Sequence, residues 1–215
     1  MITLPFSLLC TSIGAEIATL GSTCQNLGEI QRVGFQRIFS SGSTKNSFST
    51  SNGLLKTNWE TAIAADDGTK ITLSSSLYGE EKILPGGPRE DPATLGGVAA
   101  IIGSEPTAFE AILKREHQKW IERLATYSSE NLGVWLFDEH GQVGCLVDDQ
   151  DSPTAYYPIP IAPNSFFVGD PKTGNYNSLQ ENMLMWKFLP NWGRKFVTFL
   201  PTDFNPVLDL ANASS

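Results

Sequence analysis

The pattern of apolar and polar residues is most distinctive in residues 131–151, NLGVWLFDEHGQVGCLVDDQD, where two strand-like runs lie in a block without Lys or Arg. Residues 134–137 and 143–147 are rich in bulky and β-branched side chains. Residues 138–141 between them supply turn chemistry, including a glycine that tolerates positive φ. The pattern predicts an acidic β-hairpin. Because the whole first run is apolar, we expect other elements to cover both faces of its strand.

Further strands are predicted before and after this hairpin. Residues 70–78, KITLSSSLY, place apolar residues at even spacing with Ser or Thr between them, as in a half-buried strand. Pro, Gly and Asn separate three later β-like runs, which are residues 165–169, 182–189 and 195–200. The polar C-terminal tail has two predicted apolar anchors, Phe204 and Leu208.

One helix is predicted, over about residues 107–127. Pro106 suits a first helical turn, and Thr107 with Glu110 offers a capping box. Apolar residues then follow in steps of three and four, at Phe109, Ile112, Leu113, Trp120, Leu124 and Tyr127. We expect Phe109, Leu113, Trp120 and Leu124 to pack on a sheet. The predicted fold class is therefore mainly β with one flanking α-helix, in a β-sandwich or small barrel.

The chain divides into an arm and one domain. Residues 1–55 are rich in Ser, Thr, Gly and Asn, which predicts a flexible leader or an arm that orders only against a neighbour. Residues 56–215 form the predicted β-sandwich domain. Within it, Pro and Gly residues at 84–97 break helix and ladder alike, so this segment is expected to be a long exposed loop.

Composition narrows the classes of function. The chain is 40% hydrophobic and only 18% charged, which indicates a globular protein whose charge-poor surface meets partners. Its net charge of -8 argues against a nucleic-acid-binding surface, which requires clustered Lys and Arg. The apolar N-terminus lacks the basic region of a signal peptide, because the first basic residue is Arg32. No apolar run approaches the roughly 20 residues of a membrane span.

Asp, His and Cys side chains are the candidates for metal binding or for reaction. Asp148, Asp149 and Asp151 with His140 could bind a divalent cation, but the spacing lacks the glycine and terminal Glu of a calcium loop, so a solvated turn is favoured. Cys10, Cys24 and Cys145 have no metal or disulfide spacing and are interpreted as reduced thiols. His117 is interpreted as a surface residue of the helix. The sequence therefore predicts no catalytic, cofactor-binding or metal-binding residues.

The sequence is also compatible with two other functions. Carboxylates distant in sequence could meet in space and hydrolyse a glycoside, which a sequence alone does not reveal. Four aromatic residues could form a platform for a sugar or a base, although packing in the core or between subunits is favoured. They are Trp186, Phe188, Trp192 and Phe196.

Five segments in a fixed order give the chain a resemblance to a known family. They are NWETAIAADDGTKITLS, LGGVAAIIGSEPTAFEAI, NLGVWLFDEHGQVG, YPIPIAPNSFFVGD and LPTDFNPVLDL. Over about residues 59–210, this order resembles virion structural proteins of tailed phages that infect Bacteroidetes-type bacteria, specifically tail tube subunits. The charge-poor N-terminal third departs from a minimal tube subunit.

The resemblance implies a fold, partners and a location. Tail tube subunits are β-sandwiches with a flanking helix and a long loop, and they form stacked hexameric rings around a channel for DNA. It implies a structural protein without enzymatic activity or cofactors, whose partners are itself and other virion proteins, and through whose channel DNA passes without specific binding. It would be made in the host cytoplasm and located in the virion tail. The alternatives are another virion component, such as a head-to-tail connector or capsid-associated protein, or a carbohydrate-binding β-sandwich.

Overall fold

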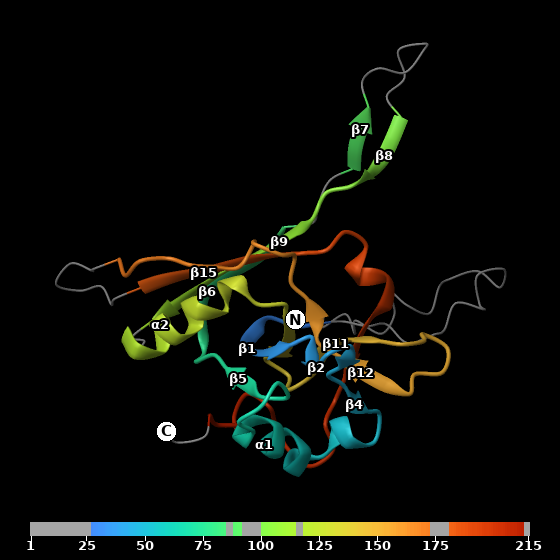
Figure 1. The fold of residues 1–215 in the computed structure, drawn as a ribbon, viewed down its shortest axis with the longest axis vertical. Coiled ribbons are helices and arrows are strands. Elements are labelled where there is room, and N and C mark those ends of the chain that lie inside the picture. The colour runs from blue at the N-terminus through green and yellow to red at the C-terminus, as the bar shows by residue number, and fades with distance from the viewer. Residues whose placement is uncertain (1–26, 85–87, 92–99, 115–117, 173–180, 213–215) are drawn as a thin grey trace, which may run out of the picture.

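The computed structural model describes residues 27–84, 88–91, 100–114, 118–172 and 181–212. The fold is 42% strand and 18% helix, so the prediction of a mainly β protein is confirmed. Within the described residues, a large curled antiparallel sheet and a smaller sheet form the body, and helices α1 and α2 lie against it (Figure 1).

The large sheet has eight strands and curls into a half-barrel. Its main order is β4-β12-β11-β10-β1-β5, while β13 pairs with β10 and β16 pairs with β11. The strand bounds are β1 (Ile30–Arg37), β4 (Phe48–Ser49), β5 (Ile71–Leu73), β10 (Leu132–Asp138), β11 (Val143–Val147), β12 (Ala155–Tyr157), β13 (Ile159–Pro160) and β16 (Phe196–Phe199). Strands β10 and β11 pair with each other only next to their turn. Beyond Leu136 and Gly144 they diverge, and β13 pairs with β10 while β12 pairs with β11.

The smaller sheet has four strands in the order β14-β15-β9-β6. Its strands are β6 (Leu77–Leu84), β9 (Thr107–Lys114), β14 (Phe167–Val168) and β15 (Glu181–Phe188). Two separate ribbons pair β2 (Phe39–Ser41) with β3 (Thr44–Lys45) and β7 (Pro88–Asp91) with β8 (Ala100–Ser104). The helices are α1 (Lys56–Ala64) and α2 (Gln118–Ala125).

The predicted hairpin is confirmed as β10 and β11 at the centre of the large sheet. Every residue of β10 is buried, as expected for a strand covered on both faces. Val134 and Leu136 belong to one core cluster, whereas Trp135 and Phe137 belong to a second cluster on the opposite face. Alternation of side chains along a strand explains this division. The strand therefore separates the two cores of the molecule.

Different elements cover the two faces. The first core lies between the large and the small sheet, where Phe109 of β9 stacks on Trp186 of β15 with ring centroids 4.0 Å apart. Leu124 of α2 completes this core. The second core is covered by α1, whose Trp59 packs edge-on against Trp135, and by the C-terminal segment.

The prediction of a helix over 107–127 is wrong in its first half. Thr107–Lys114 is a strand that pairs with β15 on one side and with β6 on the other. Phe109, Ala111 and Leu113 point into the core. The buried positions therefore recur every second residue, as in a strand, and Ala111 is one of them. Within the described residues, helix α2 spans Gln118–Ala125, where Leu124 is buried and Trp120 is half-buried. Sheet pairing on both sides overrides the helical propensity of Ala, Glu, Leu and Lys.

The predicted arm is also wrong from residue 30 onward. Ile30–Arg37 forms β1, which pairs with β10 and β5 in the large sheet. Val33 and Phe35 are buried in the first core. The composition of residues 1–55 concealed this strand, because its neighbours are rich in Ser, Thr and Gly. Residues 1–26 lie outside the described part of the chain.

Three smaller predictions also change. The expected strand at 70–78 is split between β5 and the start of β6. The expected loop at 84–97 includes strand β7, and its residues 85–87 and 92–97 lie outside the described residues. Of the predicted tail anchors, Phe204 is buried, but Leu208 is exposed and Leu210 takes its place in the second core.

Candidate functional site

The turn of the central hairpin is organised around a buried carboxylate. Asp138 Oδ1 accepts hydrogen bonds from the backbone N–H groups of His140 at 3.0 Å and Gln142 at 2.7 Å. Its Oδ2 accepts another from Gly28 N at 2.9 Å, which ties the chain before β1 to the hairpin. Gly141 has φ of +79°, as the turn pattern predicted. Asp138 therefore has a structural role, as a hydrogen-bond acceptor for the turn. Its signal in the sequence is an Asp placed two residues before the turn residue whose N–H it accepts.

The acidic residues considered for a cation do not converge. His140 lies at one end of β11, whereas Asp148 follows its other end. Asp148 accepts hydrogen bonds from Thr154 N and Thr154 Oγ1, and these bonds lower the pKa of its carboxyl. Among the described residues, no group of His, Cys, Asp and Glu is placed to hold a metal ion. His117 lies outside the described residues.

The cysteine and aromatic candidates are packing residues where the structure describes them. Burial within β11 raises the pKa of the Cys145 thiol, so its thiolate is disfavoured. Cys10 and Cys24 lie outside the described part of the chain. Trp186 and Phe188 are buried in the first core, and Trp192 and Phe196 pack against it. These four side chains therefore form no exposed platform.

A first surface cavity, of about 240 Å³, lies between β1, the end of α2 and the segment before β5. Its charged groups are largely engaged with each other. Arg37 binds Glu130 through two hydrogen bonds of 2.6 and 2.8 Å, which lower the pKa of the Glu130 carboxyl. The ammonium of Lys70 donates to the carbonyl of Ala65 at 2.9 Å. With Arg123 and two aspartates also at its wall, the cavity favours neither an anion nor a cation.

A second cavity, of about 290 Å³, has an apolar floor and a basic rim. Ile38, Leu146 and two prolines contribute to the floor, while Lys45 and Lys195 lie at the rim. We call it the lysine-rimmed pocket; its lining residues are Ile38, Lys45, Asn46, Leu146, Val147, Asp148, Tyr157, Pro158, Pro160 and Lys195. Sequence reasoning missed this site, because residues 38 and 195 meet only through the fold. Both cavities are smaller than the roughly 300 Å³ at which small-molecule sites usually begin.

The most prominent feature of the surface is the β7–β8 ribbon, which projects far from the body (Figure 1). Its register runs from Pro88 opposite Ser104 to Asp91 opposite Ala100. An isolated two-stranded ribbon is marginally stable in water. Contact with a neighbouring molecule would therefore stabilise the ribbon.

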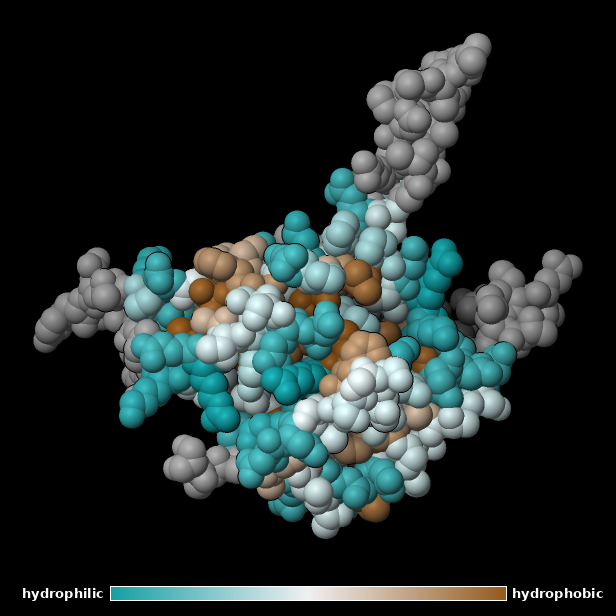
Figure 2. Space-filling view, in the orientation of Figure 1, coloured by the Kyte–Doolittle hydropathy of each residue, from teal (hydrophilic) through white to brown (hydrophobic). Residues whose placement is uncertain are grey.

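Large apolar side chains are also exposed on the body. The side chains concerned are Leu55, Phe167, Met183, Leu189, Leu200 and Leu208. Figure 2 shows brown apolar surface between teal polar regions, including along the upper margin over the smaller sheet. Large apolar side chains exposed singly are ordinary on protein surfaces, so these six residues do not by themselves define an interaction surface.

Comparisons with family models, with curated proteins and with solved structures found no match to this chain. Within the described residues, no helix combines the length and the apolar character that crossing a bilayer requires.

Proposed function

We propose that this protein is a structural subunit of a phage tail tube, which self-assembles into stacked rings around a channel for DNA. The observation that carries the proposal is the β7–β8 ribbon projecting from a mainly β body (Figure 1). A ribbon of this kind gains stability when a neighbouring subunit covers it. The resemblance of residues 59–210 to tail tube subunits supplies the specific assembly, with hexameric rings in the virion tail.

Charge supports the same role. A channel that conducts DNA requires a surface that does not bind phosphate, and the net charge of this chain is -8. The proposal assigns no catalytic step to the protein. The carbohydrate-binding alternative is less well supported, because Trp186 and Phe188 are buried in the first core.

Replacement of the ribbon tests the proposal. Since Leu84 of β6 lies opposite Ala108 of β9, residues 86–106 can be replaced by a two-residue Asn-Gly turn that continues the β6–β9 hairpin. We expect the full chain to form rings or rods in negative-stain images and the shortened chain to be a folded monomer by light scattering. Thr107, whose hydroxyl accepts the Trp192 indole N–H at 3.1 Å, is retained.

The control changes the other ribbon, with Ser43→Lys in the β2–β3 turn, and should assemble as the full chain does. Equal thermal unfolding of all three proteins would show that the body is intact. A full chain that remains monomeric at high concentration, or a shortened chain that assembles normally, would contradict the tube proposal.

A further inference from the structure

The most exposed large hydrophobic residue among those described is Leu208, of which 78% is accessible. It lies on a turn that is anchored at both ends, because Phe204 before it and Leu210 after it are buried in the second core. Asn205 N donates to the Asp209 carboxylate at 2.7 Å, and Asp209 N donates back to the Asn205 carbonyl at 2.8 Å. The turn therefore presents Leu208 in a fixed position, which reduces the entropy lost on binding.

Two carboxylates lie close to Leu208 along the chain. Asp203 and Asp209 are exposed near it in sequence, and no Lys or Arg follows Lys195. We call residues 203–209 the leucine turn. It combines one exposed apolar side chain with two exposed carboxylates, and the nearby Arg32 guanidinium donates to the carbonyls of Val207 and Leu210 rather than to either carboxylate.

The lysine-rimmed pocket has the complementary character. Its floor includes Ile38, Leu146 and Pro158, which suit an aliphatic side chain. Lys45 and Lys195 are the exposed basic residues of its lining, and Lys195 Nζ donates to the Asp148 carbonyl at 2.8 Å rather than to a carboxylate. The Asp148 carboxylate also lines the pocket and accepts hydrogen bonds from Thr154, so the two lysines face one carboxylate there and outnumber it. On a chain with an acidic balance, this pocket is a local site for an acidic, apolar partner.

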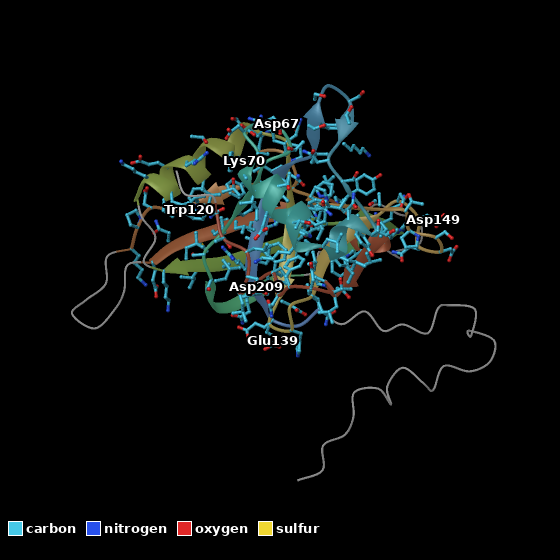
Figure 3. The ribbon with its side chains drawn as sticks, turned by 90° about the horizontal axis from the view of Figure 1, so that it is seen from below. Asp67, Lys70, Trp120, Glu139, Asp149 and Asp209 are labelled. Atoms are coloured by element: carbon cyan, nitrogen blue, oxygen red, sulfur yellow. The ribbon has the colours of Figure 1, made fainter. Side chains whose placement is uncertain are left out.

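We propose that the leucine turn of one copy docks in the lysine-rimmed pocket of a second copy, with Leu208 on the apolar floor and Asp209 facing the lysines. The inference deepens the proposed function and rests on it. In Figure 3, Asp209 and Asp149, which follows pocket residue Asp148, lie on well-separated parts of the molecule. Two different surfaces thus meet, and such a heterologous contact generates rings or filaments rather than closed pairs.

Single substitutions test each half of the contact. Leu208→Ser in the turn and Lys45→Glu at the rim should each raise the protein concentration needed for half-maximal assembly by about tenfold or more, as for a central contact residue. Asp209→Asn keeps an oxygen for Asn205 N and removes the charge, so it should weaken assembly less and make it less sensitive to salt. Leu200→Ser is the matched control, because Leu200 is another exposed leucine, at 61%. This substitution should leave assembly unchanged.

A mixing experiment makes the test specific. Leu208→Ser retains a working pocket and Lys45→Glu retains a working turn, so a mixture should form 1:1 complexes by light scattering that neither variant forms alone. Wild-type assembly together with unaltered assembly of both variants would overturn the docking and leave the tube proposal standing. A wild-type chain that never assembles would overturn both. If one variant fails to fold, the other variant still decides.

Discussion

At the scale of single residues, the pairing of β10 with β13 leaves no room for a side chain at Gly133. A Cβ at this position would lie 2.7 Å from Cβ of Pro158, in the segment that joins β12 and β13. Gly133 itself pairs with Pro160 across the β10–β13 contact. The glycine therefore allows the inserted segment to approach β10 closely, and a larger residue would force the two apart.

We predict that Gly133→Ala lowers the free energy of unfolding by about 1–3 kcal/mol. The added methyl group would overpack against Pro158 and displace the backbone of the paired strands β10 and β13. Denaturant unfolding followed by tryptophan fluorescence measures this change. Gly193→Ala is the control, since a Cβ there meets nothing within 4 Å and should change stability by less than about 0.5 kcal/mol. Equal effects of the two substitutions would show that the approach of Pro158 is not a constraint.

At the scale of elements, the edge of the large sheet is closed by a side chain. β5 is the last strand of the sheet, and Leu73 within it is fully buried. The Asn212 amide accepts a hydrogen bond from Leu73 N and donates one to Leu73 O, both at 2.8 Å. One side chain thus occupies the position of a further strand, and it satisfies the edge that would otherwise pair with another chain.

Removal of this amide should be costly. We predict that Asn212→Ala destabilises the fold by about 1–3 kcal/mol, because the Leu73 N–H and C=O lose partners in a buried setting. Amide hydrogen exchange at Leu73 should become faster in the variant, whereas exchange at Val33 in the neighbouring strand should change less. Unchanged exchange at Leu73 together with unchanged stability would contradict the role of Asn212 as an edge partner.

The elements also show what could be predicted from sequence. The hairpin of β10 and β11 was predictable, because its continuous apolar run and its turn residues indicate the same structure. Residues 107–114 were not, because Phe109 and Leu113 fit both a helical and a strand period, and only pairing with β6 and β15 decides between them.

The candidate sites also differ in whether the sequence carries a local signal for them. The structural role of Asp138 has a local signal in the turn that follows it. The lysine-rimmed pocket has none, because Lys45 and Lys195 are brought together by the long-range pairing of β4, β12, β11 and β16.

At the scale of the whole molecule, the C-terminal segment joins the first strand to the second core. The guanidinium of Arg32 on β1 donates to the carbonyls of Ser74, at 2.6 Å, and Leu210, at 2.5 Å. Burial lowers the pKa of Arg32, and the carbonyl partners offset part of that cost. Phe204 and Leu210 then cover the side of the second core near Trp59. The segment therefore contributes to stability through its buried residues and to assembly through its exposed ones.

This separation gives a prediction with a matched pair two residues apart. Leu210 is 3% exposed and Leu208 is 78% exposed. We predict that Leu210→Ala destabilises the fold by about 2–5 kcal/mol, because it opens a cavity in the second core. Leu208→Ala should change the free energy of unfolding by less than about 0.5 kcal/mol. Denaturant unfolding of both variants at a concentration below assembly measures the difference. Equal destabilisation would mean that Leu208 also serves the core of its own copy, and it could not then be free to bind a neighbour.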